Sequence, residues 1–139
     1  MEDKYHLSRF TDAQRQDFDR AYAEIKAGRK VTHWMWYIFP QLSGLGFSSM
    51  AQRYGIGSLN EAAAYLQHPV LGPRLISICE ALLRLEENNA TRIMGSPDDM
   101  KLRSSMTLFS AVPGADAVFQ AVLSKFFSGM KDEQTLQRI

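Results

Sequence analysis

Apolar positions recur at helical spacing along most of the chain and are interrupted at glycine and proline. The clearest stripe occupies positions i, i+3, i+4 and i+7 of one segment: Phe18, Ala21, Tyr22 and Ile25. This spacing places the four side chains on one face of a helix. Thr11 and Gln14 have the spacing of a capping box, and Gly28 fits the C-terminal cap. We therefore predict a helix over residues 12–27.

Four more helices are predicted downstream, at residues 58–67, 73–86, 96–110 and 116–127. Ser58 and Glu61 repeat the capping-box spacing. Ser96 is placed as an N-cap, followed by Pro97 in the first turn, where the missing N–H would be unpaired in any case. Asp132 is predicted to cap a short terminal helix.

Residues 31–57 have a different pattern. Residues 33–40 are almost wholly apolar or aromatic and end at a proline, which fits either a buried strand or a buried helical turn. Residues 41–49 contain two glycines and three serines, and they are predicted to form an irregular loop. Ser48 or Ser49 then caps a short helix. The fold class that follows is mainly α, with this aromatic, Gly/Ser-rich irregular segment inside it.

Composition and charge exclude several classes of protein. The chain has 139 residues and is 45% hydrophobic, which predicts one globular domain over residues 1–139. Its 16 basic and 15 acidic residues nearly cancel, which makes nucleic acid an unfavourable partner. No apolar run reaches the roughly 20 residues of a membrane span. The N-terminus lacks the charged-then-apolar order of a signal peptide, so we expect a cytoplasmic protein.

Cysteine and histidine usage predicts neither a metal nor a cofactor. The chain has one cysteine, Cys79, which excludes an internal disulfide and a cysteine cluster. The three histidines are far apart in the sequence and lack metal-ligand spacing: His6, His33 and His68.

The charge is nevertheless unevenly spread. Residues 25–60 contain no acid, whereas an even spread of the 15 acids would place about four there. We call this stretch the acid-free segment. Its basic and aromatic residues suit a ligand that carries phosphate and a ring. The candidate ligand-binding residues are Lys30, His33, Trp34, Trp36 and Arg53. Burial of the two tryptophans in the core is the competing interpretation, and the glycines of the loop complete neither a dinucleotide fingerprint nor a P-loop.

A second candidate region opens the helix predicted at residues 96–110. Asp98 and Lys101 are spaced i, i+3, and Asp99 and Arg103 are spaced i, i+4, so each pair can meet on a helix surface. Two surface ion pairs are one interpretation. In the other, a pair turns inward to line a polar pocket, where Lys101 or Arg103 binds an anion and Ser104 and Ser105 add hydrogen bonds. The candidate catalytic carboxylates, which would orient water, are Asp98 or Asp99 and then Glu61.

Four separated blocks carry a more specific signal: residues 28–42 (GRKVTHWMWYIFPQL), 50–54 (MAQRY), 68–75 (HPVLGPRL) and 98–109 (DDMKLRSSMTLF). Together they resemble the bacterial family of domains of unknown function numbered 1810, some of whose members carry the label calpastatin. The resemblance extends over roughly residues 10–136. It implies a mainly α-helical single domain and no established activity.

A weaker resemblance is to the YbiA-like group, which includes N-glycosidases acting on ADP-ribose-like or riboflavin-intermediate substrates. The shared features are an early aromatic segment ending in proline, residues 36–40, and the later pairs Ser105-Met106 and Lys125-Phe126. The chain lacks the Glu-His-x-x-Gln signature of that group. No catalytic residue is therefore carried over.

Two hypotheses of different classes follow. The first is a pocket that binds a phosphate-bearing metabolite, nucleotide or ADP-ribose-like, with cleavage of an N-glycosidic bond as its reaction. The alternative is a non-enzymatic interaction module that uses an aromatic and methionine patch, with a homodimer as one version. The observation that bears most on the choice between the two hypotheses is whether six side chains face one cleft: Lys30, His33, Arg53, Asp98, Lys101 and Arg103.

Overall fold

The computed structural model describes residues 3–139. Met1 and Glu2 lie outside the described residues. Both belong to the predicted domain 1–139 and to the N-terminal stretch that was compared with a signal peptide. The described residues form nine helices: α1 (Ser8–Lys26), α2 (Met35–Ile38), α3 (Ser49–Tyr54), α4 (Leu59–Gln67), α5 (Leu71–Arg84), α6 (Ala90–Met94), α7 (Asp98–Ser110), α8 (Val118–Phe127) and α9 (Glu133–Arg138). Their β pairing is limited to one isolated bridge between Leu42 and Ile56. The mainly α fold class is therefore confirmed.

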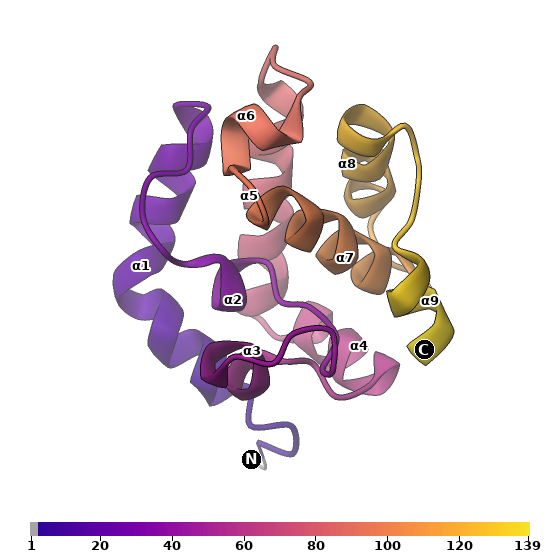
Figure 1. The fold of residues 1–139 in the computed structure, drawn as a ribbon. Helices are drawn as coiled ribbons and strands as arrows, with labels where there is room; N and C mark the ends of the chain where they lie inside the picture. The colour runs from indigo at the N-terminus through magenta and orange to yellow at the C-terminus, as the bar shows by residue number, and fades with distance from the viewer. Residues whose placement is uncertain (1–2) are drawn as a thin grey trace.

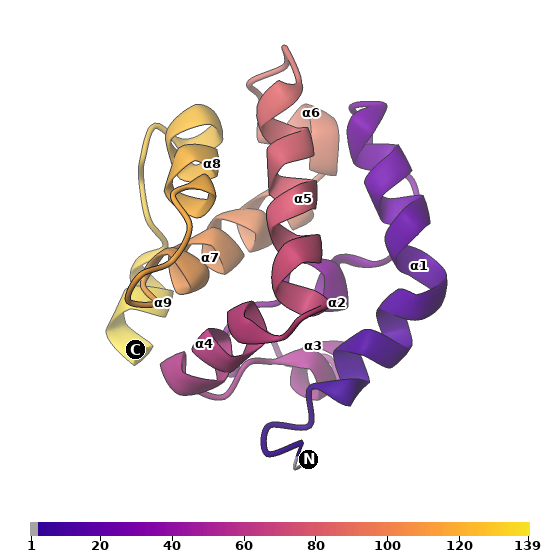
Figure 2. The same cartoon turned by 180° about the vertical axis from the view of Figure 1, so that it is seen from behind.

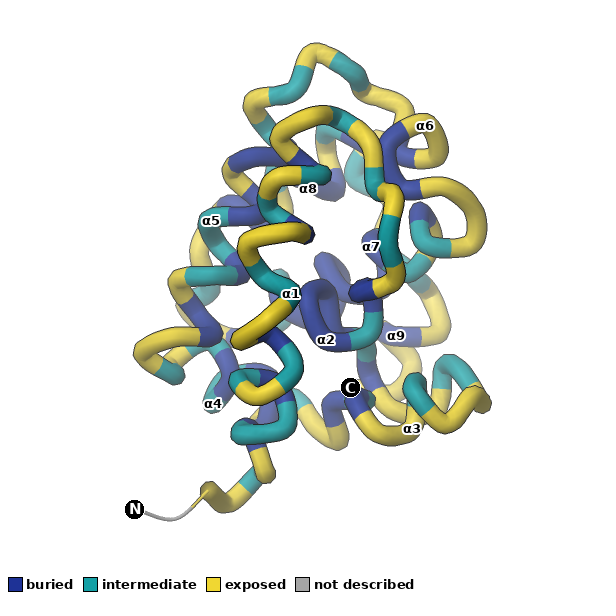
Figure 3. The backbone as a smooth tube through the Cα atoms, turned by 90° about the vertical axis from the view of Figure 1, so that its left-hand side faces the viewer, coloured by how far each residue is buried: buried dark blue, intermediate teal, exposed yellow. Residues whose placement is uncertain are grey.

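Helix α5 is the central element. It packs between α1 and α8, an arrangement that is clearest from behind (Figure 2). Helix α7 crosses the other side of the bundle and contacts α4, α6, α8 and α9 (Figure 1). The short turn α2 lies against α1 and is almost wholly buried, as Figure 3 shows in dark blue.

A row of buried aromatic rings joins the helices into one core. Phe10 of α1 meets Tyr65 of α4 edge-on at 5.1 Å between centroids. Tyr65 lies 5.3 Å from Phe109 of α7, which lies 5.8 Å from Phe119 of α8. All four are fully buried. Such ring pairs add to the hydrophobic stabilisation that burial already supplies, so the core ties early and late parts of the chain together.

The ambiguous aromatic segment is a helical turn. Met35–Ile38 form α2, and this turn is followed by the irregular segment, as predicted. Two backbone hydrogen bonds close the base of that segment, from the Ser43 amide to the Ile56 carbonyl and from the Ile56 amide to the Gln41 carbonyl, each 2.8 Å. Ser48 caps α3 through a bond from the Ala51 amide to its hydroxyl.

Several predicted helix boundaries need correction. Helix α1 begins at Ser8, because the Asp3 carboxylate accepts hydrogen bonds from the Leu7 and Ser8 amides and satisfies the first turn there. Thr11 is inside the helix and donates to the Ser8 carbonyl. Helix α5 begins two residues earlier than predicted, at Leu71. The short helix α6, capped by the Asn89 side chain, has no counterpart in the prediction.

The caps at Ser58 and Asp132 are confirmed. The Ser58 hydroxyl accepts from the Glu61 amide, and the Asp132 carboxylate accepts from the Thr135 amide. Ser96 does not cap α7, which begins at Asp98. Within residues 3–139, no helix combines the length and the apolar character that crossing a bilayer requires.

Candidate functional site

An open groove of about 510 Å³ lies between the irregular segment and α7. One side is formed by residues of the loop, including Gln41, Phe47 and Ser48. The other side is lined by three polar residues of α7 that the sequence selected: Lys101, Arg103 and Ser104. Figure 1 shows the segment after α2 passing beneath α7. Two separately predicted regions thus border one groove, which we call the α7 groove.

Two lysines share one carboxylate beside the α7 groove. Lys30 Nζ lies 2.9 Å from Asp98 Oδ2, and Lys101 Nζ lies 3.5 Å from Asp98 Oδ1. Each ammonium also lies over a tryptophan ring, Lys30 at 4.8 Å from Trp34 and Lys101 at 5.6 Å from Trp36. Lys30 is only 6% exposed and donates in addition to a backbone carbonyl, whereas Lys101 is 30% exposed. Lys101 is therefore the lysine that a ligand in the groove can reach.

Arg103 lacks the partners that a guanidinium usually has. Its Nε is buried and has no hydrogen-bond partner among the described residues. Its Nη2 lies 3.8 Å from Asp132 Oδ1, which is beyond hydrogen-bond distance. Nearby, the Ser104 hydroxyl donates to the Met100 carbonyl. Ser105 is fully buried and does not line the groove, and its Oγ has no partner within residues 3–139.

Glu61 and its ion-pair partner Arg9 form hydrogen bonds with the backbone of the acid-free segment. Glu61 forms an ion pair with Arg9, 2.8 Å between Oε2 and Nη2, with both side chains 9% exposed. Its Oε1 accepts from the Gly57 amide at 3.0 Å. Arg9 in turn donates to the carbonyls of Arg53 and Gly55. Glu61 does not line the α7 groove, and its carboxylate fixes the C-terminal end of the acid-free segment through Gly57 and Arg9.

Asp99 also has a structural partner. Its Oδ2 accepts a 2.6 Å hydrogen bond from the Thr91 hydroxyl, which joins α7 to α6. It makes no ion pair with Arg103, so the i, i+4 pair expected from the sequence does not form. Among the described residues, no group of His, Cys, Asp and Glu side chains is arranged to hold a metal ion.

Glu24 holds the other end of the acid-free segment. Its Oε1 accepts from the Val31 amide, the Thr32 amide and Trp34 Nε1, and its Oε2 accepts from the Thr32 hydroxyl, at 2.6–3.0 Å. Burial raises the pKa of this carboxyl, but the hydrogen bonds from Thr32, Val31 and Trp34 outweigh burial and lower the pKa to about 2. The two acids that bound the segment in sequence therefore both fix it in space.

The remaining predicted ligand residues are dispersed. Trp34 is fully buried, and Trp36 is partly exposed. His33 and Arg53 are exposed, and neither lines the α7 groove. The Arg53 guanidinium lies over the Tyr54 ring at 5.5 Å. Of the six side chains whose convergence on one cleft the sequence left open, two line the groove, Lys101 and Arg103.

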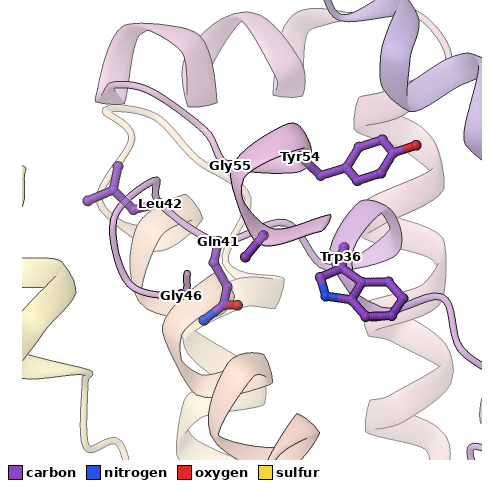
Figure 4. A pocket seen from close by; sticks show the side chains of 7 residues that line it. Trp36, Gln41, Leu42, Gly46, Tyr54 and Gly55 are labelled. Atoms are coloured by element: carbon purple, nitrogen blue, oxygen red, sulfur yellow. The ribbon is translucent and has the colours of Figure 1, made fainter. Parts of the chain in front are cut away.

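A small cavity of about 10 Å³ adjoins the groove under the loop. It shares Gln41, Gly46 and Ala51 with the groove, and Trp36 forms part of its wall. Figure 4 shows the Gln41 side chain extending between Gly46 and Trp36. This volume suits about one water molecule, so of these two adjoining spaces the groove is the one with room for a metabolite.

Sequence reasoning missed four residues that the structure makes important. Arg9 and Glu24 act through contacts with residues that the chain brings close only after folding. Phe47 and Gln41 line the groove. Phe47 is 84% exposed, and the signal that could have identified it is an isolated aromatic residue among glycines and serines.

The comparisons with known proteins agree with one another. The family model described as a protein of unknown function (DUF1810) matches residues 4–139. The crystal structure of the conserved hypothetical protein Rv1873 from Mycobacterium tuberculosis is similar, with a TM-score of 0.95 and 47% sequence identity over 97% of this chain and 96% of that chain. None of the curated proteins matches the chain.

Proposed function

The chain belongs to the DUF1810 family of proteins of unknown function, and we propose that it binds a phosphate-bearing small molecule, of the nucleotide or ADP-ribose type, in the α7 groove. The observation that carries the proposal is Arg103. Its Nε is buried without a hydrogen-bond acceptor, and its Nη2 is 3.8 Å from the nearest carboxylate oxygen. A buried donor without an acceptor is costly, and phosphate oxygens are well suited to a guanidinium.

Lys101 supports the same assignment. Its 3.5 Å contact with Asp98 is long for an ion pair, and its side chain is partly exposed beside the groove. An anion in the groove can therefore approach the ammonium without first breaking a short bond. Ser48 on the loop side supplies a hydroxyl at the edge of the groove. The anion would thus meet two cations from one helix and polar groups from the facing loop.

Cleavage of an N-glycosidic bond in the bound ligand is a narrower proposal, and Asp98 is the carboxylate that best supports it. Water would add across the bond, leaving a hydroxyl on the sugar carbon and a proton on the departing base. All three candidate carboxylates have partners: Glu61 pairs with Arg9, Asp99 accepts from Thr91, and Asp98 pairs with Lys30 at 2.9 Å. Asp98 contacts Lys101, which lines the groove. Asp98→Asn would then abolish release of the base while retaining binding, measured by chromatography with ADP-ribose and adenosine 5′-monophosphate as substrates.

Binding is tested with two groove variants and a matched control. Lys101→Gln and Arg103→Gln each remove a cation from the groove, whereas Arg53→Gln removes an exposed cation outside it. Loss of a charged hydrogen bond costs about 1.5–3 kcal/mol, which corresponds to roughly 10–100-fold in affinity. Calorimetric titration with adenosine 5′-monophosphate and ADP-ribose should show this loss for both groove variants and an unchanged affinity for Arg53→Gln.

Two outcomes would contradict the proposal. One is the absence of binding by the wild-type protein to any phosphorylated probe. The other is an equal loss of affinity in Arg53→Gln and in the groove variants, which would mean that general charge, and not the groove, attracts the anion. Thermal unfolding of each variant checks that the fold is retained.

The interaction-module hypothesis receives less support. It relied on exposed tryptophans, but Trp34 is fully buried and Trp36 partly so. Phe47 and Met100 are exposed, and they line the same groove. A homodimer through this surface stays a prediction, which light scattering would test against the 15.8 kDa mass of one chain.

A further inference from the structure

The α7 groove has two chemically different ends. Its α7 side carries the cations Lys101 and Arg103 together with Ser104 of the same helix. Its loop side carries Leu45 and Phe47. Phe47 is 84% exposed, the highest exposure among the large apolar residues of the described chain. An aromatic ring left in water at the edge of the groove offers a face on which a planar ring can stack.

The net charge of the α7 side limits how many phosphate groups the groove can accept. Three cations lie at or behind the α7 wall, Lys30, Lys101 and Arg103, and two carboxylates offset them, Asp98 and Asp132. One positive charge remains. A single phosphate group carries about −1.5 to −2 at neutral pH, so one such group already exceeds the excess positive charge. Within residues 3–139, no cation besides Lys101 and Arg103 lines the groove for a second or third phosphate.

Gln41 lies where its side-chain amide could form hydrogen bonds with the edge of a ligand's ring. Its side chain lines both the groove and the small cavity beside it. Figure 4 shows the Gln41 side chain lying between Gly46 and Trp36. A side-chain amide offers both a donor and an acceptor, which suits the edge of a nucleobase.

We infer that the ligand of the α7 groove carries one phosphate group and one planar ring, as a nucleoside 5′-monophosphate does, with the phosphate at Lys101 and Arg103 and the ring on Phe47. This inference rests on the proposed function, and it narrows the ligand class. It excludes ADP-ribose and nucleoside triphosphates as the preferred ligands. It also makes Phe47 a specificity-determining residue that the fold does not need.

The test is a calorimetric comparison of four probes: adenosine 5′-monophosphate, ribose 5-phosphate, adenosine 5′-triphosphate and inorganic phosphate. Base stacking on an aromatic side chain is worth about tenfold or more in affinity. The wild-type protein should bind adenosine 5′-monophosphate at least about tenfold more tightly than ribose 5-phosphate. It should bind the triphosphate no more tightly than the monophosphate.

Phe47→Ala should remove the preference for the ring and leave the affinity for ribose 5-phosphate unchanged. Because Phe47 is so exposed, this variant should fold as the wild type does. Val31→Ala is the matched control, since Val31 is 69% exposed and does not line the groove. It should bind all four probes as the wild type does.

The outcomes separate the two proposals. Equal binding of ribose 5-phosphate and adenosine 5′-monophosphate by the wild type overturns the ring assignment, and tighter binding of the triphosphate overturns the charge assignment. In both cases the proposed function stands, because phosphorylated probes still bind. If none of the four probes binds, the proposed function fails and this inference fails with it.

Discussion

Glu24 is the most informative residue to perturb, because one carboxylate fixes the start of the acid-free segment. It accepts four hydrogen bonds, from two amides, one hydroxyl and the Trp34 indole. Glu24→Gln retains the shape of the side chain. If the amide oxygen takes the place of Oε1, it can keep the three N–H donors, and the Thr32 hydroxyl can turn round to accept from the new NH₂ group. Only the charge is then lost.

The expected loss of unfolding free energy follows from the loss of this charge. Charge-assisted hydrogen bonds contribute about twice as much as neutral ones, and three donors sharing one oxygen are less than additive. We expect Glu24→Gln to lower the free energy of unfolding by about 2 kcal/mol. Glu24→Ala also leaves the indole N–H of the fully buried Trp34 without its acceptor. Its expected cost is about 4 kcal/mol.

The pH dependence gives the sharper test. The pKa of Glu24 falls from 4.5 to about 2 in the folded protein. A lowered carboxyl pKa stabilises the fold above pH 4.5, and this contribution is lost as the pH falls toward 2. The difference in unfolding free energy between the wild type and Glu24→Gln should therefore be full at neutral pH and smaller by about half near pH 3.

Urea denaturation followed by tryptophan fluorescence and circular dichroism measures this difference at several pH values. Equal stability of the wild type and Glu24→Gln at neutral pH would refute the role of the carboxylate. A difference that stays constant down to pH 3 would refute the assigned pKa shift.

Three further predictions follow from particular contacts. Arg9→Ala leaves the Glu61 carboxylate, whose side chain is 9% exposed, without its ion-pair partner, and should cost about 3–5 kcal/mol in chemical denaturation. The exposed pair of Arg15 and Asp12 is the control, since Arg15→Ala should cost under about 1 kcal/mol; similar losses in both variants would argue against a structural role for Arg9. Gly72→Ala places a Cβ 2.1 Å from the Leu66 carbonyl oxygen, so α4 and α5 must move apart. The expected cost is about 3 kcal/mol, and an unchanged melting temperature would show that this approach is looser than described. Asp132→Asn removes a carboxylate that faces Arg103 and retains an N-cap for α9. The variant should therefore bind adenosine 5′-monophosphate more tightly than the wild type in calorimetry. Weaker binding would contradict an anion site at Arg103.

The helices were predictable where local rules decide them. Ser58 and Asp132 are caps that depend on the next three residues, and both caps form as predicted. The start of α1 was misplaced because Thr11 and Gln14 have the spacing of a capping box, whereas the first turn is satisfied by Asp3, four and five residues before the Leu7 and Ser8 amides. That spacing matches no local cap rule and depends on the path of the chain before Leu7. Helix α6 was missed because five residues are too few for periodicity to appear.

The same distinction applies to the candidate site: placement by helical spacing was predictable from the sequence, and contacts between distant segments were not. Lys101 and Ser104 are spaced i, i+3 on one helix, so their joint placement on the groove follows from helical spacing. Arg103 is only two residues from Lys101, and its place on the same groove required the structure. Lys30 and Asp98 come together only because the segment after α1 returns across the N-terminal end of α7. The spacing of residues in the sequence cannot predict a contact between segments that are so far apart in the chain. The lack of acids between Glu24 and Glu61 was visible in the sequence, but the reason, that both acids turn back onto the segment, required the structure.

The most direct test of the α7 groove is to map adenosine 5′-monophosphate onto the protein by amide chemical-shift perturbation. We expect the shifted amides to lie in residues 41–51, in α7 around Lys101–Ser104, and near Asp132. Shifts confined to α1 and the exposed side of α5, or no shifts at millimolar ligand, would contradict the assignment of the groove as an anion-binding site.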